Sequence, residues 1–280
     1  DLERRDIGFA RCFTVIRVDD PTLAIAESIT RAASTREAEN NGVKLEDSAL
    51  RRAWSLQQRF ATNGSPVGRT VDFVRRTIRQ AVNNYQKSIS EADLVGAFCR
   101  DSGLPEVLLM DDVALDLEDV RGQLSSRVMG QTAAVNSVAN IIGVAKAGLA
   151  SDERPLGSFL FIGPTGVGKT ELARALAMFL FGTQDRMVRI DMSEYSHGDA
   201  YARLIGEGTD DGDLTGPVRR QPFSVVLLDE LEKAHPSVFD LLLQVLGEAR
   251  LTDVKGRTTR FQNTIIVMTI AFWGRIDGNM

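Results

Sequence analysis

The sequence is poor in cysteine. It has two among 280 residues, Cys12 and Cys99, and no Cys-x-x-Cys pair. This scarcity excludes a disulfide scaffold and argues against a cysteine-based zinc site. It suits a reducing compartment, so we expect a cytoplasmic protein.

Two further absences narrow the class. No run of the sequence approaches the roughly 18 apolar residues that a membrane helix needs, and we expect no secretory signal peptide. A net charge of −5 offers no cationic surplus for nucleic acid or an anionic membrane. The composition, 43% hydrophobic and 25% charged, is that of a globular protein of one or two domains. Because the chain begins with Asp1, we expect a piece of a longer protein.

The first hundred residues have a mainly helical pattern. "FTVIRVDDP" (13–21) predicts a short strand that Pro21 ends. From Thr22 to about Arg100, apolar residues recur every three or four positions, which predicts helices. Residues 101–125 are interpreted as a linker, because Gly-Leu-Pro at 103–105 breaks the helical pattern. The predicted domains are therefore 1–100 and 126–280.

The second half changes character after a further predicted helix over 131–150. Four apolar runs of buried-strand type alternate with two helical patterns. The runs are 158–163, 187–192, 224–230 and 263–269, and the helices are 169–182 and 236–249. Strands buried on both faces and alternating with helices predict an α/β fold with a parallel sheet.

"GPTGVGKT" is the most specific motif of the chain. It matches G-x-x-x-x-G-K-[ST] between a predicted strand and a predicted helix, the context that a phosphate-binding loop requires. Glycines let successive N–H groups face one anion, and the helix that follows adds its positive dipole end. We expect the lysine to reach the β- and γ-phosphates of ATP and the threonine hydroxyl to ligate Mg²⁺. The motif residues are Gly163, Pro164, Thr165, Gly166, Val167, Gly168, Lys169 and Thr170.

"VVLLDE" (225–230) places two carboxylates at the end of a buried strand. Ligands of open α/β sheets bind at the carboxyl ends of the strands. We expect Asp229 to hold Mg²⁺ through water. Glu230 is the candidate catalytic residue, positioned to polarise the attacking water.

Several long segments resemble the second ATPase ring of the Clp family, which comprises AAA+ unfoldases and disaggregases of the ClpA and ClpB type. The segments are "RPLGSFLFIGPTGVGKTELARALA", "RIDMSEY", "RLIG", "VVLLDELEKAHPSVFDLLLQVLGEARLTD" and "GRTTRFQNTIIVMT". Residues 22–100 resemble, more loosely, the helical lid of the first module. The resemblance implies a P-loop AAA+ fold whose parallel sheet is incomplete at its C-terminus.

The resemblance also implies partners and roles. It implies a homo-hexameric ring, driven by ATP, that pulls polypeptide substrates through a channel; a peptidase partner stays open. Val128 and Met129 would lie beside the adenine, although plain core packing is an equal alternative. Arg11 stands at one of two positions for arginines that reach a neighbour's nucleotide, but Cys12 occupies the other. His235 is expected to cap the helix that begins at Pro236.

The chain departs from the family in its tail and in one loop. Ile270 and Ala271 follow Thr269 where the family has an asparagine that senses the attacking water, and Arg275 is interpreted as incidental in a truncated or altered tail. Between "RLIG" and "LTGPVRR" stand only seven residues, "EGTDDGD" (207–213), without the aromatic residue that grips substrate. The spacing does not fit a calcium-binding loop. We therefore expect a solvated acidic loop that does not grip polypeptide.

Three functions stay open from the sequence. The first is an ATP-hydrolysing Clp-type unfoldase. The second is a nucleotide-binding assembly or regulatory subunit with weak hydrolysis and no threading. The third is a DNA-remodelling ATPase, which the lack of a basic patch and the blocks "DMSEY" and "DELEKAHP" disfavour.

Overall fold

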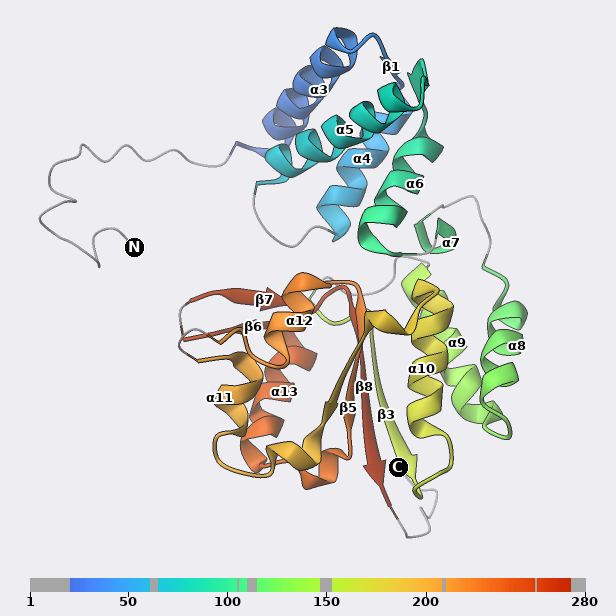
Figure 1. Cartoon of the computed structure of the whole chain (residues 1–280), viewed down its shortest axis with the longest axis vertical. Helices are drawn as coiled ribbons and strands as arrows, with labels where there is room; N and C mark the ends of the chain where they lie inside the picture. The colour runs from blue at the N-terminus through green and yellow to red at the C-terminus, as the bar shows by residue number, and fades with distance from the viewer. Residues whose placement is uncertain are drawn as a thin grey trace, which may run out of the picture. The chain divides into compact units, whose positions relative to one another are not determined.

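The chain forms two units, which divide between Glu91 and Ala92. The computed structural model describes residues 21–60, 65–104, 106–109, 115–146, 153–207, 210–254 and 256–272 (Figure 1). The strand expected over 13–21 lies almost entirely outside these residues, as do Arg11, Cys12 and Arg275.

The first unit is helical, as its periodicity predicts. Phe73 and Ile78 lie on the buried face of α5 (Pro66–Asn83), and Ile89 of the contacting strand β2 (Ser88–Ile89) is buried as well. Pro66 occupies the first turn of that helix, where its missing N–H leaves no hydrogen bond unmade. The elements are α3 (Leu23–Asn40), β1 (Lys44–Leu45), α4 (Asp47–Phe60), α5 (Pro66–Asn83) and β2 (Ser88–Ile89), with β1 and β2 paired in parallel.

The segment interpreted as a linker contains a helix of the second unit. Asp116 caps this helix by accepting a hydrogen bond from the Glu118 backbone N–H at 2.8 Å. Val120 and Leu124 are each 1% exposed and pack into the core of the α/β unit. The linker expectation is therefore corrected for this stretch. The four helices before the sheet are α6 (Glu91–Ser102), α7 (Glu106–Leu109), α8 (Leu117–Arg127) and α9 (Thr132–Lys146).

The four predicted strands form one parallel sheet, in the order β3-β8-β5-β4. The strands are β3 (Gly157–Gly163), β4 (Met187–Asp191), β5 (Ser224–Asp229) and β8 (Thr264–Ala271). The two long helices are α10 (Lys169–Phe181) and α13 (Pro236–Glu248), and the shorter elements are η1 (Gln184–Arg186), η2 (Met192–Tyr195), α11 (Ala200–Ile205), α12 (Thr215–Arg220) and η3 (Leu231–Lys233). An antiparallel hairpin of β6 (Arg250–Thr252) and β7 (Thr258–Arg260) precedes β8.

Helices cover both faces of this sheet, with α11 and α13 on one side and α9 and α10 on the other (Figure 1). Strand β5 is buried at every position because its alternate residues enter two cores. Val226 belongs to the core beneath α13, whereas Leu227 belongs to the core beneath α10. In contrast, Leu160 and Ile162 of β3 are nearly half exposed, since in the described residues β3 pairs only with β8.

The connection between α11 and α12 returns sharply on itself. Gly206 and Gly212 both have positive φ, of 85° and 76°. A Cβ added to Gly212 would lie 2.4 Å from the Gly206 nitrogen, so the two backbones touch where only glycine fits. The Leu214 N–H donates to the Leu204 carbonyl at 3.0 Å and closes the base of the loop. Residues 206 and 212 thus form a narrow neck.

The close backbone approach at this neck should make substitution of Gly212 destabilising, whereas substitution of a glycine elsewhere in the chain should be tolerated. Gly212→Ala should lower the free energy of unfolding by at least about 2 kcal/mol, because it adds positive-φ strain to steric overlap. Gly122→Ala in α8 is the control. A Cβ there meets nothing within 4 Å, so stability should hold or rise by about 0.5–1 kcal/mol. Urea unfolding followed by circular dichroism measures both, and a fully stable Gly212→Ala variant would contradict the neck.

Candidate nucleotide site

The glycine-rich loop joins the end of β3 to the start of α10. Gly166 and Gly168 adopt φ of 84° and 97°, which turns the backbone before the helix begins. The Lys169 ammonium donates hydrogen bonds to the carbonyls of Gly163 at 2.7 Å and Pro164 at 2.8 Å. The ammonium group of Lys169 therefore lies over the loop. An anion bound by the N–H groups of the loop would also contact this ammonium group.

Asp229 carries a nearly buried charge at the end of β5, with 7% of the residue exposed. Its carboxylate accepts a hydrogen bond from Thr269 Oγ1 at 2.6 Å and forms an ion pair with Arg189 Nη2 at 2.8 Å. Thr170 Oγ1 lies 3.4 Å from both of its oxygens. The structure thus brings Thr170 of the loop and Asp229 of the strand together, as the sequence analysis expects.

Glu230 follows in a strained backbone conformation. Its φ of 58° is in the left-handed region, which costs a non-glycine residue roughly 1–2 kcal/mol. Its N–H donates to Thr269 Oγ1 at 3.0 Å, and its carboxylate pairs with Lys233 Nζ at 2.5 Å. Hydrogen bonding to Glu230 raises the pKa of Lys233. Strain of this kind gathers at functional sites.

Sequence reasoning missed Thr269 and Arg189. The Thr269 hydroxyl donates to Asp229 and accepts from the Glu230 N–H, so one side chain fixes both candidate carboxylate residues. The available signals were weak: a hydroxyl at the end of the apolar run "TIIVMT", and one cation within "MVRID". Neither shows its partner, about 40 residues away along the chain.

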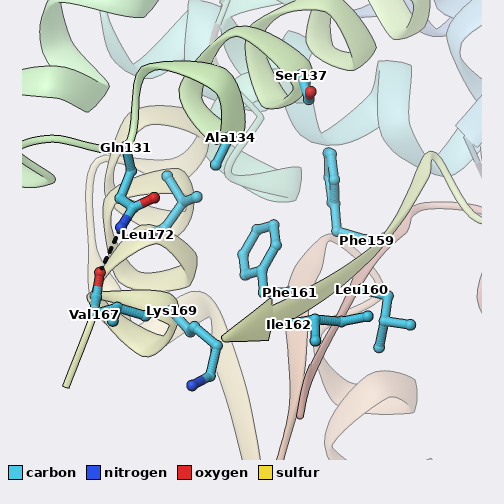
Figure 2. A pocket seen from close by; sticks show the side chains of 11 residues that line it. Gln131, Ala134, Ser137, Phe159, Leu160, Phe161, Ile162, Val167, Lys169 and Leu172 are labelled. Atoms are coloured by element: carbon cyan, nitrogen blue, oxygen red, sulfur yellow. Dashed lines mark hydrogen bonds between the residues drawn. The ribbon is translucent and has the colours of Figure 1, made fainter. Parts of the chain in front are cut away.

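A cavity of about 280 Å³ lies beside the loop (Figure 2). Phe159, Phe161 and Leu172 supply apolar walls, and Lys169 lies at one end. Gln131 also lines the cavity, and its Nε2 donates to the Val167 carbonyl at 3.2 Å. The size and mixed lining suit the remainder of a nucleotide whose phosphates occupy the loop.

The two residues expected beside an adenine differ in exposure. Val128 is 4% exposed and belongs to the core, yet its Cγ1 would lie 3.6 Å from a Cβ on Gly168. Met129 is 86% exposed. Val128 therefore packs beneath the loop, and the adenine contact of both residues stays a prediction. His235 behaves as expected: it caps α13, with Nδ1 accepting the Ser237 N–H at 3.2 Å.

The described carboxylate residues of the acidic loop are exposed, as expected, but arginines also hold the loop in place. Asp211 pairs with Arg257 at 2.8 Å and Arg219 at 3.4 Å, and the hydrogen bond from Arg257 lowers the pKa of Asp211. The same two arginines also pair with Asp253, whose side chain is 1% exposed. These four residues form a closed ring of opposite charges that ties the loop to the β6–β7 turn.

Tyr195 anchors the other end of the loop. Its hydroxyl donates to Asp213 Oδ2 at 2.6 Å, and burial together with this hydrogen bond raises the pKa of Tyr195. Glu207 is exposed. Among the described residues, no three acidic, histidine or cysteine side chains cluster as metal ligands would. The carboxylates of Asp210, Asp211 and Asp213 thus make contacts within the protein, Asp210 by accepting the Gly212 N–H at 3.2 Å.

A phosphate-binding loop between strand β3 and helix α10, with an Asp-Glu pair at the carboxyl end of β5 in the same sheet, defines a P-loop ATPase module. Residues 154–278 match the family model described as "AAA domain (Cdc48 subfamily)". No helix among the described residues combines the length and apolar character needed to cross a bilayer.

Two curated relatives are similar over most of the chain. The ATP-binding subunit ClpC of the ATP-dependent Clp protease of Staphylococcus aureus (strain USA300) is 49% identical over 197 residues, 68% of this chain and 24% of the relative. "Probable chaperone protein ClpB 1" of Chlorobaculum tepidum is 47% identical over 190 residues, 66% of this chain and 43% of the relative. The chain thus spans less than half the length of either relative.

Solved structures of S. cerevisiae Hsp104 resemble almost all of the chain. The casein complex in its extended conformation has a TM-score of 0.81 at 33% identity, covering 96% of this chain and 48% of the Hsp104 chain. The ADP complex has a TM-score of 0.77 with the same identity and coverage. The chain belongs to the Clp family of AAA+ ATPases.

The bridging hydroxyl of Thr269 gives a test of the site's architecture. Thr269→Val should lower the free energy of unfolding by about 1–3 kcal/mol, because the nearly buried Asp229 loses a hydrogen bond and the Glu230 N–H loses its acceptor. Thr269→Ser keeps the hydroxyl and should stay within about 1 kcal/mol of the parent. Denaturant unfolding of the three proteins measures this, and equal stability of all three would refute the bridge.

Proposed function

We propose that this chain supplies an ATP-hydrolysing module of a Clp-type protein-remodelling machine. The observation that carries the proposal is the joining of Lys169, Thr170, Asp229 and Glu230 at the carboxyl edge of one sheet, beside a cavity of about 280 Å³. Gly163 to Thr170 bind the phosphates of ATP, and Lys169 contacts the β- and γ-phosphates. The base lies toward Val128, Met129 and Gln131.

The donor set suits Mg²⁺. This ion takes hard oxygen ligands, and Asp229 and Thr170 present a carboxylate and a hydroxyl 3.4 Å apart. A bound Mg²⁺ would neutralise charge on the β- and γ-phosphates. Thr269 and Arg189 hold the Asp229 carboxylate in place, and Glu230 orients the attacking water and polarises it.

The relatives suggest the setting of this reaction. One of the matching Hsp104 structures is described as a complex with casein, a polypeptide. We propose a homo-hexameric ring in which ATP hydrolysis remodels polypeptide substrates. A peptidase partner would follow from the likeness to ClpC, a subunit of a protease.

A second candidate is a nucleotide-binding assembly or regulatory subunit with weak hydrolysis. Two observations favour it. Ala271, in place of the family's water-sensing asparagine, has no polar side chain. The loop between α11 and α12 has no aromatic residue and is ion-paired to the β6–β7 turn through Asp211 and Arg257. Gripping needs apolar area, which glycines and carboxylates do not offer.

Nucleotide binding is tested at Lys169. Lys169→Ala should weaken Mg-ATP binding by about 2–4 kcal/mol, because it removes a charge-assisted contact in a partly buried site. Lys44→Ala, at an exposed lysine of β1, serves as the matched control and should bind like the parent. Isothermal titration calorimetry gives both affinities; equal affinity of the parent and Lys169→Ala would overturn the assignment of the loop.

Turnover separates the two candidate functions. We expect the parent chain to hydrolyse ATP slowly, and Ala271→Asn to raise kcat about tenfold, which corresponds to about 1.4 kcal/mol of transition-state stabilisation from one hydrogen bond. Phe272→Asn, at the exposed next residue, should leave kcat unchanged. Glu230→Gln should abolish hydrolysis in both backgrounds. Fast turnover by the parent chain, lost in Glu230→Gln, would favour the unfoldase and contradict the weak-hydrolysis candidate.

A further inference from the structure

A second cleft, of about 500 Å³, lies at the base of the β6–β7 hairpin, where α13 ends. Its lining includes Glu153, Glu248, Arg250, Thr258, Arg260 and Gln262. Glu153 precedes β3 and Gln262 precedes β8, so the cleft lies at the amino ends of the parallel strands. The phosphate-binding loop lies at their carboxyl ends. The cleft is therefore separate from the candidate nucleotide site.

The hairpin places two arginines directly opposite each other. In the antiparallel register Arg250 pairs with Arg260, and both side chains lie on the exposed face of the ladder because Leu251 and Thr259 between them are buried. Like charges at such positions destabilise a strand pair. Glu248 compensates Arg250 through an ion pair of 2.9 Å. The Arg260 side chain forms no ion pair or hydrogen bond with any residue that the structure describes.

A second group in this cleft also lacks its partner. The Oε1 atom of Gln262 is buried and accepts no hydrogen bond within the described residues. Such atoms are rare in native proteins, because an unsatisfied buried acceptor costs roughly 1–3 kcal/mol. Because this acceptor is buried, the group that the cleft presents to a ligand is the Arg260 cation, which lacks an anion.

The backbone beside the cleft is strained. Ala249, the residue between α13 and β6, has a φ of 47°, and its carbonyl accepts the Phe261 N–H at 2.7 Å. This bond sets the base of the hairpin and fixes Arg250 opposite Arg260. The backbone therefore fixes the strand positions from which the two arginine side chains extend.

We propose that this cleft binds an extended polypeptide segment through one acidic side chain. The carboxylate pairs with the Arg260 guanidinium, and the Thr258 hydroxyl lies on the same exposed face to donate a further bond. This binding supplies the missing anion and relieves the repulsion between the two arginines.

The charge pattern favours a peptide over other anions. Nucleic acid brings a row of phosphates, which Glu153 and Glu248 on the same lining would repel. One uncompensated arginine matches one carboxylate, and a cleft of about 500 Å³ has the size of sites that hold more than a single ion.

The experiment compares two capped heptapeptides, Ser-Gly-Ser-Glu-Ser-Gly-Ser and its counterpart with Gln in place of Glu. Each is titrated into the full chain without nucleotide. The parent should bind the Glu peptide about tenfold more tightly at low salt, and the preference should shrink as salt rises. Arg260→Gln should remove the preference. Arg36→Gln, at an exposed arginine of α3, should keep it.

A charge reversal shows whether a loss of binding reflects the site or the fold. Arg260→Glu creates an ion pair opposite Arg250, so the melting temperature should hold or rise while the Glu peptide is no longer bound. Lys169→Ala should leave peptide binding unchanged, which separates this proposal from the proposed ATP site. Equal affinity of the parent for both peptides would overturn the proposal. So would a preference that survives Arg260→Gln, or inorganic phosphate binding as tightly as the Glu peptide.

Discussion

The nearly buried carboxylate of Asp229 is the charge around which the carboxyl edge of the sheet is organised. A lone ionised carboxylate inside a protein is costly, so neighbouring groups must compensate it. They come from three other elements: Arg189 of β4, Thr170 of α10 and Thr269 of β8. Satisfying one charge therefore aligns three strands and the helix that follows the phosphate-binding loop. The Glu230 N–H joins the same arrangement through Thr269.

Much of the fold and part of the site could be predicted because their signals are local. Strands β3, β4, β5 and β8 are short apolar runs, and the glycine-rich loop has fixed spacing between a strand and a helix. His235 caps α13 through residues next to it in the chain. In each case the physical cause lies within a few residues, so the sequence contains it directly.

The remainder depends on contacts between distant segments. Arg189 and Thr269 each meet Asp229 across 40 residues, and Arg257 meets Asp211 across 46. Composition alone predicts residues 207–213 to be acidic and solvated, and their described carboxylates are exposed. It does not predict the ion pairs of Asp211, because Arg219 and Arg257 lie elsewhere in the chain. The sequence of helix α8 indicates a linker because Gly-Leu-Pro and nearby aspartates precede it. The two buried residues of the helix, Val120 and Leu124, are too few for a strong periodic signal.

The neck formed by Gly206 and Gly212 makes the spacing of the flanking helices independent of the length of the loop between the two glycines. Because the backbone closes at the neck, α11 and α12 keep their separation however many residues lie between the two glycines. Lengthening a closed loop costs little, about 0.6 kcal/mol for each doubling of its length. Insertions and deletions here would therefore leave the sheet and the candidate ATP site intact. This segment can diverge between related proteins while the ATPase module stays the same, which makes it a natural place for such modules to specialise.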